Sequence, residues 1–326
     1  MLDVSVIVAS VGKSDLLSEL VDALLHASVD QVEVIVVVSG SDARVDVSER
    51  ALVVVSEEPL AAATARNLGA SVATKSLLFF IDDDNRLVGD VVGVLAALLA
   101  ENSDVVLVGP TMYDAANPSF AYCSGVVHGR LFGRTLNVPN WRLDWQGIRT
   151  CDAVPNAYMV RASQFQEVDG FDDVLFPMDF EESDLAFKLR HRFQGRVVTS
   201  ARASVVHRVV QGRGAAVVPK AVNRAYWVGR NRSLFYVLHF SLWSWLSWML
   251  VGQPVALVVY SYSTLRFSSA SVRRRVALVL SLWKGFAAGA FISASCIGCV
   301  DRRLCIRRRL GRASRPVSDA GEGRGR

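Results

Sequence analysis

Three adjacent carboxylates follow one apolar stretch of the sequence, and their types and spacing are suited to binding a cation. Residues 77–81 are five consecutive apolar residues, followed directly by Asp82, Asp83 and Asp84. Such a short run is typical of a buried parallel strand, and ligands bind beyond the carboxyl ends of these strands. Adjacent carboxylates repel one another unless a cation is present, and hard oxygen ligands suit Mg²⁺ or Mn²⁺. Asp82 and Asp84 are therefore candidate metal ligands. The alternative is a solvated acidic turn, or a helix cap before residues 86–88.

A second group of carboxylates, Glu181, Glu182 and Asp184, lies where a helical pattern begins. A helix N-terminus tolerates acidic side chains because they meet the positive end of the helix dipole. These residues are therefore either first-turn caps or part of a site. His207 follows a strand-like stretch at residues 196–200, and it is either a structural histidine or a ligand.

The elements expected to position these residues alternate between strands and helices. Apolar runs at residues 4–9, 34–38 and 52–55 predict buried strands, and residues 16–25 have the apolar spacing of an amphipathic helix. A helix at about residues 61–74 precedes the strand at 77–81. This alternation predicts an α/β fold with a doubly wound, mostly parallel sheet.

The order of these motifs resembles the family 2 glycosyltransferases of the GT-A fold. The resemblance rests on VVVSGSD at residues 36–42, AAATARNLGA at 61–70 and LLFFIDDDN at 77–85. It implies that the first two strand ends and the ARN helix bind a nucleotide-diphosphate sugar, and that the acidic cluster lies at its diphosphate with a divalent cation, Mg²⁺ or Mn²⁺. The implied donor-binding residues are Ala9, Ser10, Ser41, Asp42, Arg66, Asn67, Asp82 and Asp83. The implied metal ligands are Asp82, Asp84 and His207.

The middle of the chain adds a second part to the resemblance. Gly170-Phe171-Asp172 and the segment EESDL at residues 181–185 match the family's GGFD and ED-x-D-L segments, which carry the catalytic base and acceptor contacts. The implied catalytic residues are Glu182, Glu181 and Asp184, with Glu182 standing where the family usually has Asp. The segment Ala9-Ser10-Val11-Gly12 differs from the family's Pro-Thr-Tyr-Asn, and Val38 stands where an acidic residue is common. The nucleotide is therefore left open.

The resemblance implies an enzyme, an inverting, metal-dependent glycosyltransferase of the hexosyl- or deoxyhexosyltransferase class. Its acceptor would be a hydroxyl of a glycan or a lipid-linked molecule. A sugar nucleotidyltransferase is a poorer match, because residues 10–14 lack its glycine- and arginine-rich loop. The further alternative is a non-catalytic, membrane-bound scaffold on a degenerate transferase fold.

The C-terminal third is apolar and then basic. Residues 233–262 contain no Asp, Glu, Lys or Arg, and residues 276–300 are interrupted only by Lys284. Each segment is long enough to cross a bilayer. The arginines between the two segments would lie outside in a simple hairpin, against the positive-inside rule. We therefore favour helices lying in the cytosolic leaflet over a two-span hairpin, with a buried helical subdomain as the remaining alternative.

The net charge of +5 is concentrated at the C-terminal end. Residues 301–326 hold nine arginines against three acidic residues, a net charge of +6, so the first 300 residues carry −1. A basic segment after an apolar region favours anionic lipid headgroups as partners, and no nucleic-acid partner is expected. We expect a catalytic domain at 1–232, a membrane-associated helical region at 233–300 and a basic, disordered tail at 301–326.

Localisation follows from the start of the chain and from the cysteines. The N-terminus lacks a basic segment followed by a long apolar run, so we expect a membrane-associated protein with a cytoplasmic catalytic domain. The five cysteines are odd in number and scattered, which predicts no disulfide framework. Cys296 and Cys299 form a single CxxC in an apolar stretch, where ordinary buried cysteines explain the pair as well as a metal or redox role.

Overall fold

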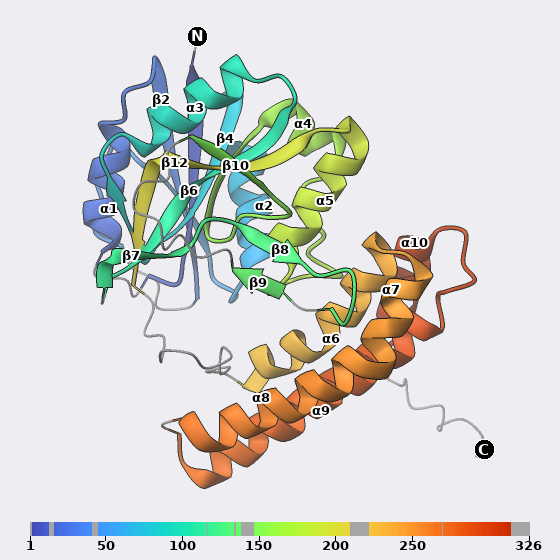
Figure 1. Cartoon of the computed structure of the whole chain (residues 1–326). Coiled ribbons are helices and arrows are strands. Elements are labelled where there is room, and N and C mark those ends of the chain that lie inside the picture. The colour runs from blue at the N-terminus through green and yellow to red at the C-terminus, as the bar shows by residue number, and fades with distance from the viewer. Residues whose placement is uncertain are drawn as a thin grey trace, which may run out of the picture. The chain divides into compact units, whose positions relative to one another are not determined.

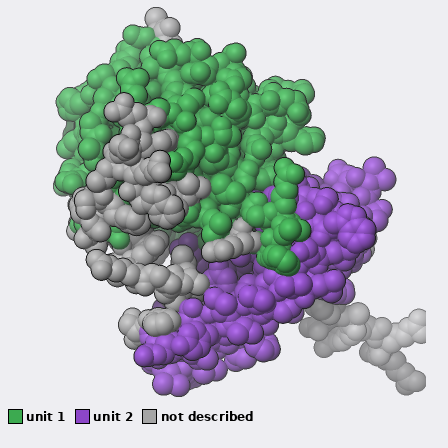
Figure 2. Space-filling view, viewed as in Figure 1, with its two compact units in different colours: residues 1–218 green, residues 219–326 purple. Residues whose placement is uncertain are grey.

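The chain forms two compact units, residues 1–218 and 219–326 (Figure 2). The computed structural model describes residues 2–12, 16–40, 45–115, 117–133, 135–137, 147–208, 222–268 and 270–313. Ser41, Asp42 and the end of the basic tail, residues 316–326, lie outside the described residues. Helix α6 (Val222–His239) is continuous across residue 232, so no break in the backbone marks the domain boundary expected there. That boundary stays a prediction.

The first unit is built on a mixed, mostly parallel sheet (Figure 1). Its main path runs in the order β10-β12-β6-β11-β4-β1-β2-β3, with β5 paired to β12 and β7 paired to β6. The strands are β1 (Asp3–Ser10), β2 (Gln31–Ser39), β3 (Leu52–Ser56), β4 (Leu77–Asp82), β5 (Asn85–Val88), β6 (Val105–Asp114), β7 (Asn117–Cys123), β10 (Ile148–Cys151), β11 (Ala157–Arg161) and β12 (Arg196–His207). A separate small sheet contains β8 (Val126–His128) and β9 (Thr135–Asn137).

Helices cover both faces of this sheet: α1 and α3 lie on one face, and α2, α4 and α5 on the other (Figure 1). Their bounds are α1 (Leu17–Leu25), α2 (Ala62–Val72), α3 (Val91–Glu101), α4 (Ala162–Glu167) and α5 (Glu181–Phe193). Apolar side chains alternate between the faces of β2, so Val36 joins the main core while Val37 packs with Ala65 of α2. The two-sided burial explains why these strands read as continuous apolar runs.

Parallel pairing brings the carboxyl ends of two strands together. In the register of β1 against β4, Ala9 is the partner of Asp82. Helix α2 approaches this pair closely at Gly69, where a Cβ atom would lie only 2.4 Å from Cγ2 of Ile7. The absence of a side chain at Gly69 therefore lets α2 lie flat on β1, with its polar residues near the strand ends.

The residues after the acidic run form a strand. Residues 86–88, considered above as a helix start, belong to β5, which pairs antiparallel with the end of β12. The register sets Asn85 opposite His207. The helix-cap alternative is wrong, because backbone pairing with β12 holds this segment extended.

The second unit is helical. After α6 come α7 (Leu242–Ser247), a π-helical turn η1 (Trp248–Gly252), α8 (Gln253–Phe267), α9 (Val272–Ala294) and α10 (Arg302–Ala313). The apolar segment at 233–262 is not one helix, because it breaks before α7 at Ser241, whose side chain caps the new helix. Pro254 does not break the helix further on. It stands near the start of α8, where the π-helical turn absorbs the change in hydrogen bonding.

Two helical stretches of this unit are long and apolar enough to cross a membrane, Leu242–Arg266 and Val272–Ala294. Within the unit, α6 and α9 pack closely at glycines, since a Cβ atom on Gly285 would lie 2.1 Å from the carbonyl oxygen of Tyr226. Much of the remaining apolar surface faces outward, with Trp243 79% exposed and Phe291 70% exposed. A buried core helix of a soluble domain would hide these side chains.

Candidate active site

The buried guanidinium of Arg66 joins three carboxylates from two other elements. Its Nη2 lies 2.6 Å from Oδ1 of Asp82 and 3.2 Å from Oε1 of Glu182, and its Nη1 lies 3.0 Å from Oε1 of Glu181. Only 3% of Arg66 is exposed. Burial alone would lower the pKa of Arg66, but Tyr158 and the three carboxylates raise that pKa well above its usual value. The sequence permits an exposed face at this position, whereas the structure makes it the centre of an ion cluster.

The two glutamates of this cluster come from the first turn of α5. Asp179 and Phe180 precede this helix with φ angles of 59° and 75°, a left-handed conformation that non-glycine residues rarely adopt. Burial raises the pKa of Glu181, and Arg66 partly opposes that shift. Burial likewise raises the pKa of Glu182 to about 8, again against the effect of Arg66. A carboxyl group with such a pKa exchanges protons near neutral pH.

The third acidic residue of this segment, Asp184, is fully buried, and its backbone N–H donates to the carbonyl of Phe180 at 2.8 Å. It therefore points into the protein, whereas Glu182 retains 16% side-chain exposure. Glu181 and Glu182 therefore lie at the ion cluster beside the end of β4, whereas Asp184 is not part of that cluster.

Asn67 lies next to Arg66 but faces another segment. Its Nδ2 donates to the carbonyl of Phe171 and its Oδ1 accepts from the N–H of Phe171, both at 3.0 Å. The ring of Phe171 in turn lies 5.9 Å from the guanidinium carbon of Arg66. Asn67 thus fixes the GFD segment, and both ends of its amide are used in doing so.

The acidic run lies at the ends of β1 and β4, as expected. Ser10 Oγ donates to Oδ2 of Asp83 at 2.5 Å and accepts from the N–H of Gly12 at 2.9 Å. Burial raises the pKa of Asp83, and the hydrogen bond from Ser10 partly opposes this. Ala9, beside Asp82 in the register, is half-buried. The first-strand residues therefore touch the acidic cluster directly.

His207 faces the third aspartate. Its Nε2 lies 3.1 Å from Oδ1 of Asp84, and its Nδ1 lies 2.8 Å from the hydroxyl of Tyr122. Oδ1 of Asp84 is buried and has no hydrogen-bond partner among the described residues. Nδ1 also lies 3.2 Å from Nδ2 of Asn156, which can only donate, so Nδ1 accepts and Nε2 carries the proton on the side of Asp84. A carboxylate oxygen and an imidazole nitrogen 3.1 Å apart are both possible ligands of a divalent cation, which would displace that proton, so the residues present suit Mg²⁺ or Mn²⁺.

Asn156 is a further site residue, one that the sequence did not single out. Its N–H donates to Oε1 of Glu182 at 2.9 Å, its carbonyl accepts from the N–H of Asp82 at 3.0 Å, and its Nδ2 lies 3.2 Å from Nδ1 of His207. It holds a left-handed φ of 64°, which Asn adopts more readily than most residues. The only sequence signal is an Asn between Pro155 and a strand, which is also typical of ordinary turns.

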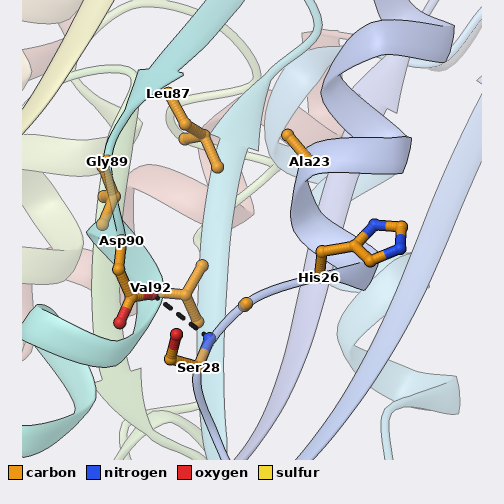
Figure 3. A pocket seen from close by; sticks show the side chains of 9 residues that line it. Ala23, His26, Ser28, Leu87, Gly89, Asp90 and Val92 are labelled. Carbon is orange, nitrogen blue, oxygen red and sulfur yellow. Dashed lines mark hydrogen bonds between the residues drawn. The ribbon is translucent and has the colours of Figure 1, made fainter.

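A small pocket of about 150 Å³ lies elsewhere in the first unit, between the end of α1 and the start of α3 (Figure 3). There Oδ1 of Asp90 accepts from the N–H of Ser28 at 3.3 Å, and the ring of His26 points away from Asp90. None of the expected site residues lines this pocket. The pocket is a helix-capping region, and it contributes nothing to the ion cluster.

Part of the chain is similar to a known protein family. Residues 5–162 match the model of glycosyl transferase family 2, a span that contains Arg66, the acidic run and Asn156. Residues 5–162 belong to that family. A search of curated protein sequences gave no match.

Solved structures of low sequence identity share the fold of this chain. The chain is similar to TarS of S. aureus, with 16% identity, a TM-score of 0.52 and coverage of 95% of this chain and 53% of TarS. It is also similar to the mannosyltransferase PcManGT of Pyrobaculum calidifontis, crystallised with GDP-Man and Mn²⁺, with 16% identity, a TM-score of 0.50 and coverage of 90% and 86%.

A third structure, GalNAc-T7 with UDP, GalNAc and Mn²⁺, has 14% identity, a TM-score of 0.50 and coverage of 72% and 50%. The chain thus spans about half the length of TarS and of GalNAc-T7. The α/β GT-A fold with apolar C-terminal helices is confirmed, whereas identities this low say nothing of substrate.

Replacing Arg66 by Met tests the ion cluster. The buried carboxylates would lose their shared partner, so we expect the free energy of unfolding to fall by about 3–5 kcal/mol. Loss of the guanidinium also raises the pKa of Glu182 above its wild-type value of about 8. The deficit should therefore grow as the pH rises through that value, where only the wild-type carboxyl ionises readily. Urea unfolding of the detergent-solubilised chain below and above this pH measures both effects.

Arg86→Met is the matched control, because Arg86 is exposed on β5 and its loss should change stability by less than about 0.5 kcal/mol. Adding Glu181→Gln and Glu182→Gln to Arg66→Met should restore part of the lost stability, since neutral amides need no cation. Equal losses for the Arg66 and Arg86 variants, or a deficit that shrinks with rising pH, would contradict the cluster's role.

Proposed function

We propose that the chain is an inverting, metal-dependent glycosyltransferase that moves a hexosyl or deoxyhexosyl group from a nucleotide-diphosphate sugar to a hydroxyl of a glycan or lipid-linked acceptor. The observation that carries this proposal is the convergence of Asp82, Asp84, His207 and Glu182 at the ends of β4, β12 and α5. The family match of residues 5–162 and the Mn²⁺ bound by similar structures support it.

Asp82, Asp84 and His207 are the proposed ligands of Mg²⁺ or Mn²⁺. When bound, such an ion would offset the negative charge that gathers on the diphosphate leaving group. Tyr122 fixes the orientation of the His207 ring through Nδ1. Ser10 holds Asp83 in place, and with Ala9 it forms the floor on which we place the donor nucleotide. Ser41 and Asp42, proposed for the same role from the sequence, lie outside the described residues.

Glu182 is the proposed catalytic base. Both of its contacts use Oε1, which accepts from Asn156 and lies beside Arg66, and Oε2 makes no hydrogen bond to the part of the chain that the structure describes. Oε2 is therefore free to take the proton of an acceptor hydroxyl as that oxygen attacks the sugar. One base with direct displacement gives inversion at the anomeric carbon.

The other predicted catalytic and donor-binding residues are proposed as positioning residues. Glu181 and Arg66 pair with each other and hold Glu182, and Asn67 holds Phe171. Asp184 is fully buried in the first turn of α5. These side chains are turned toward other protein groups. The side chains of the proposed base and metal ligands, in contrast, remain partly exposed to solvent.

The C-terminal helices are proposed to lie in the cytosolic leaflet, with the basic residues on anionic lipid headgroups and the catalytic domain cytoplasmic. Exposed apolar side chains on α8 and α9 support membrane contact. Arg273 and Arg274 stand exposed at the start of α9, in the connection between the two apolar stretches. Keeping these charges at the cytosolic surface favours helices that do not cross the bilayer.

Glu182→Gln separates the base from the binding groups. Because the amide cannot accept the hydroxyl proton, we expect kcat to fall by about 10²- to 10⁴-fold while the KM for the donor stays nearly unchanged.

Asp84→Asn tests the proposed metal ligands, and it should raise the Mn²⁺ concentration needed for half-maximal transfer. Glu167→Gln, at an exposed glutamate of α4, is the control and should leave both parameters unchanged. A Glu182→Gln enzyme with wild-type kcat would refute the assignment of the base.

Replacing Arg273 and Arg274 by Gln tests the membrane proposal. Each arginine near an anionic surface contributes about 1 kcal/mol, so the double variant should bind phosphatidylglycerol vesicles about 30-fold more weakly in flotation. The same exchange at Arg50 and Arg192, exposed in the first unit, is the control and should have little effect. Vesicle association that survives high salt and ignores both double variants would indicate spanning helices instead.

A further inference from the structure

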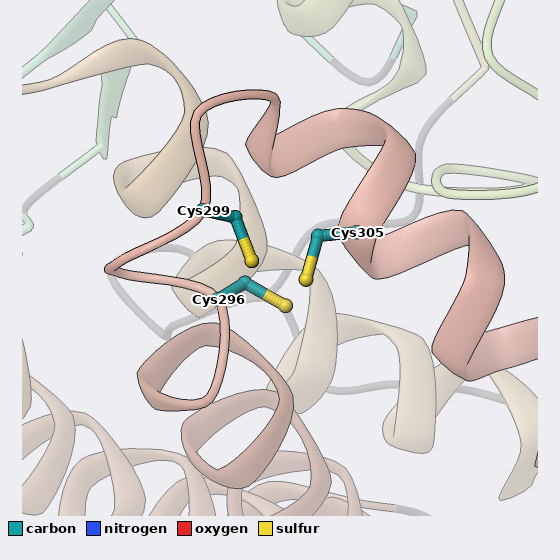
Figure 4. Close-up of side chains that lie close together, drawn as sticks. All are labelled: Cys296, Cys299 and Cys305. Carbon is teal, nitrogen blue, oxygen red and sulfur yellow. The ribbon is translucent and has the colours of Figure 1, made fainter.

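Three cysteines of the C-terminal unit gather at one point (Figure 4). Cys296 is buried just beyond the end of α9, Cys299 lies half-buried in the following turn, and Cys305 is half-buried in α10. Their Sγ atoms all lie within 4.8 Å of one another. The sequence shows the CxxC pair, but only the fold reveals that Cys305 joins it.

The turn between α9 and α10 produces this convergence. The N–H of Cys299 donates to the carbonyl of Cys296 at 3.2 Å, which folds the chain back directly after α9. Asp301 then starts α10, where its Oδ1 accepts from the N–H of Leu304 at 2.9 Å and its carbonyl accepts from the N–H of Cys305 at 3.1 Å. Cys305 is thereby held in the first turn of the helix, facing the sulfur atoms of the preceding turn.

We propose that Cys296, Cys299 and Cys305 form a thiolate site for Zn²⁺. A tetrahedral zinc ion with Zn–S bonds of about 2.3 Å separates its sulfur ligands by about 3.8 Å. Sulfur atoms already within 4.8 Å reach that spacing through small side-chain movements. Thiolates are soft ligands that select zinc over the Mg²⁺ or Mn²⁺ of the carboxylate cluster. Each thiol releases its proton on binding, and no redox step is involved.

Charge and coordination number are consistent with this assignment. Zinc with three thiolates carries one net negative charge, and Arg309 lies close by, with its Nη2 3.4 Å from the carbonyl of Ser295, next to Cys296. No fourth His, Cys, Asp or Glu among the described residues joins the group. Water or a small external ligand completes the tetrahedron. The bound ion would clamp the end of α9 to the start of α10 and stabilise that corner against unfolding.

Ordinary buried cysteines and a disulfide are the two alternatives to a zinc site, and neither accounts for all three sulfur atoms. Ordinary buried cysteines would need no convergence of three sulfur atoms from separate points of the chain. A disulfide would consume two sulfur atoms and leave the third without a role. Cys123 and Cys151, both buried in the first unit, lie outside this group, and they are matched controls for any effect of removing a thiol.

The test is metal analysis of the full chain, purified under reducing conditions with its affinity tag removed. We expect about one Zn²⁺ per chain by elemental mass spectrometry. After exchange for Co²⁺, the chain should show sulfur-to-cobalt charge-transfer absorption, which the carboxylate and histidine cluster cannot give. Cys305→Ala and Cys299→Ala should each lose this absorption and most of the bound zinc, while Cys151→Ala keeps both.

Far-ultraviolet circular dichroism checks that each variant remains folded. Cys299→Ala should disturb packing least, because Cys299 is half-buried in the turn between α9 and α10. Asp84→Asn should leave the charge-transfer band intact, which separates this site from the proposed donor site. A folded wild-type chain with no zinc and three free thiols after zinc addition would overturn the proposal. So would a disulfide in this group under reducing conditions, seen as a mass lower by two hydrogens.

Discussion

The position of the candidate site depends on one buried cation. Arg66 is almost fully enclosed, and its guanidinium is shared by Asp82 at the end of β4 and by Glu181 and Glu182 at the start of α5. Three carboxylates at this spacing would otherwise repel one another, and burial would increase that repulsion. The guanidinium therefore ties helix α2, strand β4 and helix α5 to a single geometry. The planar fork of Arg suits this task, because it donates in several fixed directions where Lys presents a point charge.

Asn156 provides a second, uncharged tie across the same region. Its backbone joins Asp82 to Glu182, and its amide lies against His207. The proposed metal ligands and the proposed base are thus linked through one residue in a strained conformation. Rigid links of this kind keep reacting groups in place before substrate arrives, which lowers the cost of reaching the transition state. The positive φ at Asn156, like those at Asp179 and Phe180, belongs to the part of the molecule where the ion cluster lies.

The sequence predicts the elements that have a strong local signal. The apolar run before Asp82 identifies β4, parallel pairing places Ala9 beside that aspartate, and the helical pattern after Ser183 identifies α5. Contacts between residues distant in the chain have no such signal. Nothing local indicates that residues 86–88 pair with β12, that Asn156 faces His207, or that Arg66 is buried. Likewise Cys305 is separated from the CxxC pair by a turn whose direction only the backbone hydrogen bonds define.

The most direct measurement of the proposed activity is release of nucleoside diphosphate by the detergent-solubilised chain. UDP-, GDP- and dTDP-sugars would each be supplied with Mn²⁺, with and without EDTA, in the presence of membrane lipid extract as a source of acceptor. The proposal predicts that one donor is consumed, that EDTA stops the reaction and that added Mn²⁺ restores it. No release from any donor, together with no thermal stabilisation by any nucleotide and Mn²⁺, would contradict the proposal and favour a non-catalytic scaffold.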